Sequence, residues 1–149
     1  MNGRADVIWD EGISAFGQLL EATTRLERRL GRSLEEDCQL PHPWFEVLLR
    51  LARSPDGRIA IGELGRQVLL TSGGITRLVD RMAEAGLVVR EPCPTDRRIQ
   101  WVRATPEGVR RLVTAAAVHA ANIDELVTRR LTARELRTLL RLLEKISRS

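Results

Sequence analysis

Apolar residues recur every three or four positions through much of the chain, a pattern typical of amphipathic helices. The first apolar stripe begins at Trp9 and predicts one long helix over residues 7–34. A second helix is expected to begin near Pro43, because proline is tolerated in a first helical turn. It should end before the Ser54-Pro55-Asp56-Gly57 run, which is a strong turn signal.

Two further helices are predicted in close succession in the middle of the chain. Residues 62–68 form a short one, and the next begins after Thr71 or Ser72, either of which suits a helix N-cap. Gly86 stands where a helix commonly ends in the left-handed conformation. This tight pairing predicts a helix-turn-helix. The inward face of the second helix is Ile75, Leu78, Val79 and Met82, and the outward face carries Gly73, Thr76, Arg77, Asp80, Arg81 and Glu84.

The next pattern is that of a β-hairpin. Two short apolar runs, 87–90 and 99–103, flank a turn-rich loop, Pro92-Cys93-Pro94-Thr95-Asp96-Arg97-Arg98. The loop would place Arg97 and Arg98 at a basic tip. Residues 59–61 are expected to add a brief strand that pairs with this hairpin.

Two helices complete the chain. Thr105-Pro106-Glu107 is a helix start, with a hydroxyl cap, proline in the first position and an acid in the first turn, and the helix should run to about Arg130. Thr132 and Glu135 have capping-box spacing at the start of the last helix. That helix places leucines on more than one face, which would leave apolar surface exposed in a monomer and predicts a partner.

The predicted fold is therefore mainly α with a small β-hairpin wing. Residues 1–149 form one chain in which a winged helix-turn-helix, 43–105, is flanked by N- and C-terminal helices, 1–40 and 106–149.

Composition narrows the class of protein. No apolar run approaches the roughly 18 residues that a membrane span needs, and the N-terminus lacks a signal-peptide pattern, so we expect a cytoplasmic protein with no membrane partner. Cys38 and Cys93 are isolated, which argues against a disulfide framework or a four-ligand zinc site. With no phosphate-binding loop and no cluster of catalytic or metal-ligating residues, we expect neither an enzyme nor a metal or cofactor.

The net charge is only +4, but all the basic residues except Lys145 are arginines. Arginine can bond guanine bidentately in the major groove, and a narrow minor groove attracts it. A GC-rich genome would also favour arginine over lysine. In addition, arginines on a helix surface usually only face solvent and bind no ligand. Arg81 in particular has Asp80 and Glu84 beside it. A helix and a basic hairpin side by side nevertheless favour DNA contact.

The region from residue 61 to residue 108 resembles the MarR family of bacterial transcription regulators. The residues that carry the resemblance are Ile61-Gly62-Glu63-Leu64-Gly65, Ile75-Thr76-Arg77-Leu78-Val79-Asp80-Arg81, Gly86-Leu87-Val88, Thr95-Asp96-Arg97-Arg98 and Ala104-Thr105-Pro106-Glu107-Gly108.

The resemblance implies a homodimer with interlocked first and last helices that binds double-stranded DNA at a pseudo-palindromic operator. Members usually repress, and many release DNA when a small aromatic acid or an oxidant acts near the dimer interface. By position, Arg98 matches the wing arginine that enters the minor groove and Asp96 the acid that orients it. The expected DNA-binding residues are Thr71, Ser72, Gly73, Thr76, Arg77, Arg81, Asp96, Arg97 and Arg98.

Some positions leave alternatives open. Gly73 and Gly74 depart from the family pattern, and either weaken the helix or allow close approach to DNA. Cys38 and Cys93 do not match the position of the family's peroxide-sensing cysteine, although either could serve a redox-responsive regulator. Trp9, His42 and Trp44 are candidate ligand-binding residues, and core packing is the alternative for Trp44. The alternative to DNA binding is a winged-helix protein–protein adaptor.

Overall fold

The first helix is divided near its start and runs further than its apolar pattern indicates. The computed structural model describes residues 6–148, beginning with a 3-10 helix, η1 (Asp6–Trp9), and then α1 (Glu11–Cys38). Asp10 separates the two and caps α1, because its Oδ1 accepts hydrogen bonds from the backbone N–H groups of Gly12 and Ile13 at 2.8 and 3.1 Å. Leu34 is fully buried, so the polar residues that follow it form the exposed face of a continuing helix rather than a loop.

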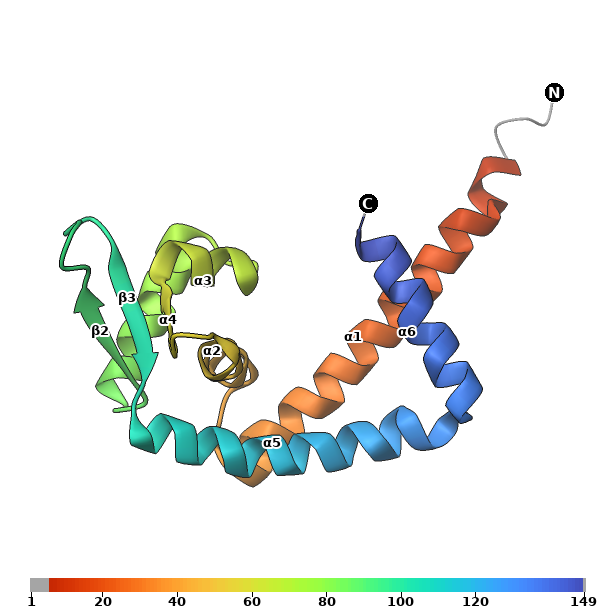
Figure 1. The fold of residues 1–149 in the computed structure, drawn as a ribbon. Coiled ribbons are helices and arrows are strands. Elements are labelled where there is room, and N and C mark those ends of the chain that lie inside the picture. The colour runs from red at the N-terminus through yellow and green to blue at the C-terminus, as the bar shows by residue number, and fades with distance from the viewer. Residues whose placement is uncertain (1–5, 149) are drawn as a thin grey trace. The chain divides into compact units, whose positions relative to one another are not determined.

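The middle of the chain forms a winged helix-turn-helix (Figure 1). Its elements are α2 (His42–Arg53), β1 (Arg58–Ala60), α3 (Ile61–Gln67), α4 (Ser72–Glu84), β2 (Val88–Pro92) and β3 (Gln100–Ala104). The strands form an antiparallel sheet in the order β1-β3-β2. Val102 of β3 lies opposite Ile59 on one side and Arg90 on the other, so the short first strand joins the hairpin as predicted.

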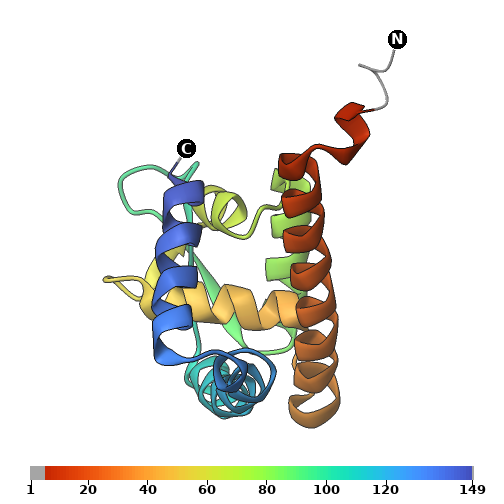
Figure 2. The same cartoon turned by 90° about the vertical axis from the view of Figure 1, so that its right-hand side faces the viewer.

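The hydrophobic core follows the predicted inward faces. All four apolar residues of α4 that share one face are buried, and Phe45, Val47, Leu48 and Leu51 of α2 pack in the same cluster. Figures 1 and 2 together show α2 crossing the first part of α5 (Pro106–Leu126) steeply. The ring of Phe45 lies 4.8 Å from that of His119 at this crossing.

The last helices begin where the capping signals indicate. After α5 come η2 (Thr128–Arg130) and α6 (Ala133–Ser147). The capping box of Thr132 and Glu135 is present, with each residue bonded to the other's backbone N–H. Helix α5, which was predicted to reach Arg130, ends instead at Leu126 and is followed by the 3-10 helix η2.

These elements divide into two compact units. One comprises residues 33–121, and the other contains the described residues up to Arg32 together with those from Asn122 onward. The fold is mainly helical with a small antiparallel sheet, which confirms the predicted class. Within the described chain, no helix has the length and apolar character needed to cross a membrane.

A junction around Thr105 fastens three elements of the 33–121 unit together. The backbone N–H of Thr105 donates to the Leu87 carbonyl at 2.9 Å. The Thr105 hydroxyl donates to the Gly86 carbonyl at 2.6 Å and accepts from the N–H of Gly108 at 3.0 Å. A Cβ added at Gly108 would lie 2.1 Å from the Leu87 carbonyl oxygen, so only glycine fits there. The end of α4, the sheet and the start of α5 are thereby locked to one another.

Four described residues have a positive φ, and two of them are not glycine. Gly57 and Gly86 adopt this left-handed conformation at no steric cost, whereas Gln39 (φ 51°) and Leu69 (φ 56°) carry a Cβ into it. Such a residue costs about 1–2 kcal/mol because its Cβ crowds the following carbonyl oxygen.

Candidate nucleic-acid interface

The outward face of α4 begins at a side-chain cap. Thr71 is the N-cap, and its Oγ1 accepts a hydrogen bond from the N–H of Gly74 at 3.1 Å. Ser72 is therefore the first helical residue, and its carbonyl accepts the hydroxyl proton of Thr76 at 2.8 Å. Thr71, Ser72, Gly73, Arg77 and Arg81 are all exposed and Thr76 is half-buried, so the predicted face is open to a ligand.

The two glycines of α4 have different surroundings. A Cβ at Gly74 would lie 3.1 Å from Thr71 Oγ1 and would crowd the cap, which gives this glycine a packing reason. At Gly73 the nearest group is Arg77 Nη1 at 3.5 Å, an ordinary contact. Packing within the protein therefore does not explain why position 73 is a glycine.

A hollow of about 610 Å³ lies along α4 and carries two cationic side chains. Both arginines of the α4 face reach it, over an apolar floor from the preceding turn and the start of α2. A concave surface of this kind suits an elongated anionic ligand. The lining residues are Pro43, Leu70, Gly74, Arg77, Leu78, Asp80 and Arg81.

An ion pair fastens the base of the hairpin to α4. Arg90 of β2 donates from Nη1 to Asp80 Oδ1 at 2.5 Å. Sequence reasoning had considered Asp80 as a partner for Arg81, but the carboxylate is used by Arg90 instead. Arg81 is exposed, and of the two acids considered as its partners Glu84 remains.

At the hairpin tip, Asp96 holds Arg98 outward. Asp96 Oδ1 accepts from the backbone N–H and the Nε of Arg98 at 3.0 and 3.1 Å, and Oδ2 accepts from Nη2 at 3.3 Å. The Arg98 side chain still has 91% of its surface exposed. Hydrogen bonds from the Arg98 side chain, then from its backbone, lower the pKa of Asp96, so this carboxylate stays charged. Arg97 is exposed beside it.

Cys93 lies at the start of the same loop and has an unusual environment. Its Sγ lies 3.2 Å from Thr95 Oγ1, and only 9% of the residue is exposed. Hydrogen bonds from the Thr95 side chain, and then from the backbone of Thr95 and Asp96, lower the pKa of the thiol to about 7. Cys38, half-buried at the end of α1, is also a free thiol.

The three candidate ligand-binding residues line neither the α4 hollow nor the arginine pocket described next. Trp9 is 80% exposed in η1. Trp44 packs against the core, and His42 lies 3.6 Å from Glu46 at the start of α2. The ring of His42 also neighbours His119, whose pKa is lowered by burial and then by repulsion from His42.

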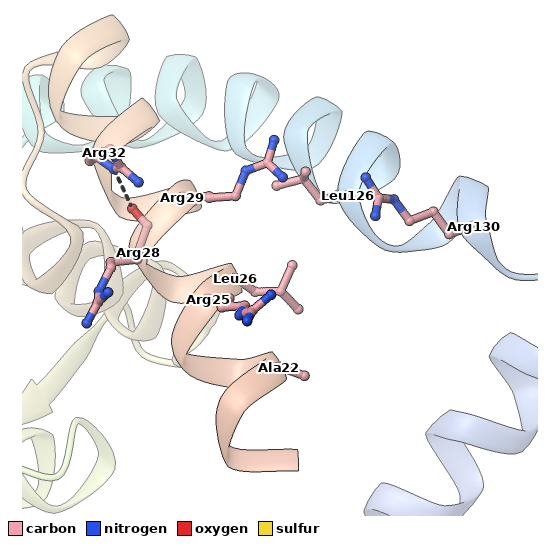
Figure 3. Close-up of a pocket in the computed structure, with 8 residues that line it drawn as sticks. All are labelled: Ala22, Arg25, Leu26, Arg28, Arg29, Arg32, Leu126 and Arg130. Carbon is pink, nitrogen blue, oxygen red and sulfur yellow. Dashed lines mark hydrogen bonds between the residues drawn. The ribbon is translucent and has the colours of Figure 1, made fainter. Parts of the chain in front are cut away.

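A second hollow, the arginine pocket, lies wholly in the unit formed by the chain's two ends (Figure 3). It measures about 530 Å³ and combines an apolar floor with a cationic rim. Arg25 is paired with Glu21 at 2.6 Å, and Arg32 Nε donates to the Arg28 carbonyl at 3.4 Å. Sequence reasoning missed this pocket, although the spacing of the α1 arginines was its visible signal. Its lining is Ala22, Arg25, Leu26, Arg28, Arg29, Arg32, Leu126 and Arg130.

The predicted DNA-binding residues thus lie on α4 and on the hairpin joined to it by the Arg90–Asp80 pair, all within residues 33–121. Arg90 is the linking residue that sequence reasoning missed. Only the opposite charges of two residues ten positions apart could have indicated the pair.

Comparisons with known proteins agree on one family. The family model described as the MarR family matches residues 39–99. The multiple antibiotic resistance protein MarR of Escherichia coli (strain K12) is 32% identical over 134 residues, covering 90% of this chain and 92% of that protein. The HTH-type transcriptional regulator MhqR of Bacillus subtilis (strain 168) is 38% identical over 66 residues, which span 44% of this chain and 46% of that protein.

The structural comparison extends this likeness to a protein bound to DNA. A crystal structure of a MarR family transcriptional regulator from Streptomyces coelicolor in complex with DNA superposes with a TM-score of 0.82. It is 32% identical, and the match covers 89% of this chain and 83% of that one.

Proposed function

Because the chain belongs to the MarR family of DNA-binding transcriptional regulators, we propose that it is a homodimeric repressor released from its operator by a small aromatic acid. Members of this family are regulators and not enzymes, as the sequence indicated. Repression and effector release are the usual mode of the family that the sequence resembles. The protein would act in the cytoplasm, where the chromosome lies.

In the proposed complex, each protomer lays α4 in the major groove and its wing in a flanking minor groove. Thr71, Ser72, Gly73, Thr76, Arg77 and Arg81 would meet bases and phosphates, and Arg97 would meet a phosphate. The observation that carries the proposal is Arg98, held outward by Asp96 at the hairpin tip. A two-fold dimer would contact half-sites about 34–36 Å apart.

Replacing Arg98 tests this arrangement. Arg98→Ala should weaken binding by roughly tenfold or more, equivalent to about 1.4 kcal/mol, because a desolvated arginine contact is lost. Fluorescence anisotropy would measure it on a duplex that the wild-type protein selects from a random pool. The side chain is 91% exposed, so the melting temperature should not change.

Arg110→Ala is the matched control, since Arg110 is an exposed arginine of α5 paired with Glu107. It should bind like the wild type. A salt series on the wild-type protein adds a second test, because duplex affinity should fall steeply as counterions are released. If no duplex is selected at all, the protein–protein adaptor becomes the better hypothesis, and equal affinities of the two variants would remove Arg98 from the interface.

The apolar surface of the terminal unit supports dimerisation. Phe16 of α1 is 66% exposed, and so much apolar surface on one helix is unfavourable in a monomer. Exposed apolar residues lie on η1, α1 and α6: Val7, Ile8, Trp9, Ile13, Phe16, Leu19, Leu20, Leu140, Leu142, Leu143 and Ile146.

The arginine pocket supports an effector of the proposed chemistry. Arg29 and Arg130 can pair with a carboxylate, while Leu26 and Leu126 offer apolar contact to a ring (Figure 3). Trp9, His42 and Trp44 remain alternative ligand contacts in this proposal. Quenching of tryptophan fluorescence on addition of the acid would favour those alternatives.

A further inference from the structure

Leu69 combines two unfavourable features in the turn between α3 and α4. Its backbone is left-handed, with φ 56°, and 92% of its surface is exposed. A leucine gains nothing from water, and its Cβ makes the left-handed conformation strained. The residue therefore carries a backbone cost that burial of its side chain does not offset.

The turn has the hydrogen bonds of a Schellman motif. The N–H of Leu70 donates to the Gly65 carbonyl at 2.8 Å, and the N–H of Leu69 donates to the Arg66 carbonyl at 3.3 Å. In this motif the left-handed position is usually a glycine. Leu69 occupies that position at the end of α3.

The same unit contains the motif in its usual form. At the end of α4, the N–H of Leu87 donates to the Met82 carbonyl and that of Gly86 to the Ala83 carbonyl, both at 2.9 Å. There the left-handed residue is Gly86, with φ 75°. The chain thus has glycine at the end of α4 and an exposed leucine at the end of α3. Leu69 shares this backbone strain with Gln39, but of the two only Leu69 combines it with an exposed apolar side chain, and that combination points to a function.

The position of Leu69 indicates what its side chain meets. It lies two residues before Thr71, the cap of α4, and next to Leu70, which lines the α4 hollow with Arg77 and Arg81. Arg77 and Arg81, which line this hollow with Leu70, belong to the proposed DNA interface. The apolar groups that a duplex offers there are the thymine 5-methyl group and the C–H groups of deoxyribose.

We infer that Leu69 is a DNA-contact residue whose isobutyl group packs against a thymine methyl or a deoxyribose when α4 lies in the major groove. This inference rests on the proposed DNA-binding function. It adds an apolar contact, made by the helix-turn-helix turn itself, to the polar contacts of α4 and the wing.

The test separates stability from affinity. Leu69→Gly removes both the strain and the side chain, so the melting temperature should rise by about 2–4 °C while duplex affinity falls roughly fivefold. Leu69→Ala removes the side chain but keeps a Cβ at positive φ, so affinity should fall without that rise. Gln39→Gly is the matched control: it relieves the same strain at the end of α1 and should raise the melting temperature with unchanged affinity.

The duplex supplies the second arm. Uracil in place of each thymine of the selected duplex removes the methyl groups. If Leu69 contacts a thymine methyl group, uracil at that one position weakens binding of the wild-type protein but not of Leu69→Ala. If Leu69 contacts deoxyribose, uracil affects the wild-type protein and Leu69→Ala equally, and the Leu69 variants still bind every duplex more weakly than the wild type.

This inference would be overturned if Leu69→Gly and Leu69→Ala bound the duplex as tightly as the wild type while Arg98→Ala bound it weakly. The proposed function would then still stand. A change in sedimentation of the Leu69 variants with unchanged duplex affinity would also overturn it, and would assign the leucine to a protein contact. Failure of the wild-type protein to bind any duplex would instead overturn the proposed function.

Discussion

At the scale of single residues, Cys93 shows how a short loop changes the chemistry of a thiol. Its N–H donates to the Ile99 carbonyl at 2.9 Å, which fixes the start of the wing loop. The Thr95 hydroxyl lies 3.2 Å from the sulfur, where it can donate to the thiolate, and such hydrogen bonds favour the charged form. Cys93 is therefore partly ionised near neutral pH, where an ordinary cysteine is not.

We predict that Cys93 ionises with a midpoint near pH 7 in the folded protein, compared with 9.0 for an ordinary thiol. Because the pKa is lowered on folding, the thiolate stabilises the fold above about pH 9, and this contribution is lost as the pH falls through about 7. Thiolate absorbance in a Cys38→Ser background would measure the midpoint, and Thr95→Val should raise it. A midpoint near 9 in both proteins would contradict the prediction.

Some residue-level features were readable from the sequence and others were not. The Asp96–Arg98 pair was implied by the resemblance to the MarR family, and the structure contains it. The choice between Thr71 and Ser72 as cap was not, because it depends on a backbone angle. Leu69 was unreadable for the same reason: the sequence Leu69-Leu70 shows two apolar residues but not a positive φ.

At the scale of elements, α1 concentrates positive charge on one surface. Arg25, Arg29 and Arg32 are spaced i, i+4 and i+7, so like charges lie one turn apart, and Arg28 adds a fourth. Like-charged pairs at this spacing destabilise a helix by about 0.2–0.5 kcal/mol each. A bound anion would relieve that repulsion.

Arg29→Gln should therefore raise the stability of the free protein slightly and remove its response to an aromatic acid. A thermal-shift titration with salicylate measures both effects, since a ligand that binds the native state raises the melting temperature. Arg137→Gln, which removes an exposed arginine of α6 outside the pocket, should keep the wild-type response. An unchanged shift for Arg29→Gln would place the effector elsewhere, or exclude this acid.

Periodicity located the helices well and their ends less well. The inward face of α4 was predictable because four apolar residues repeat at helical spacing and all are buried. The end of α1 was not, because a polar run is compatible with either a loop or a solvated helix face. The arginine pocket requires the end of α5 as well as α1, and no local pattern records such a tertiary approach.

At the scale of the whole molecule, the exposed apolar surface of the terminal unit predicts self-association. Phe16→Glu should place a charge in the proposed interface and shift sedimentation from dimer to monomer. Operator affinity should then fall strongly, because each protomer would bind its half-site alone. Unit 33–121 has its own core, so its helical content should remain.

Gln18→Glu is the control for that variant, since Gln18 is a polar, exposed residue of the same helix. It adds a charge without entering the apolar stripe, and it should sediment as the wild type does. Dimeric sedimentation of Phe16→Glu would contradict the proposed interface.

The bonds around Thr105 have a mechanical consequence. The Thr105 hydroxyl is bonded to the Gly86 carbonyl, and Gly108 packs against the Leu87 carbonyl. These contacts hold the first turn of α5 directly against the residues that follow α4. A movement of the first turn of α5 would therefore be transmitted to α4, the helix proposed to lie in the major groove. A rotation of α5 could then reposition the DNA-binding helix directly, without a hinge between the two helices.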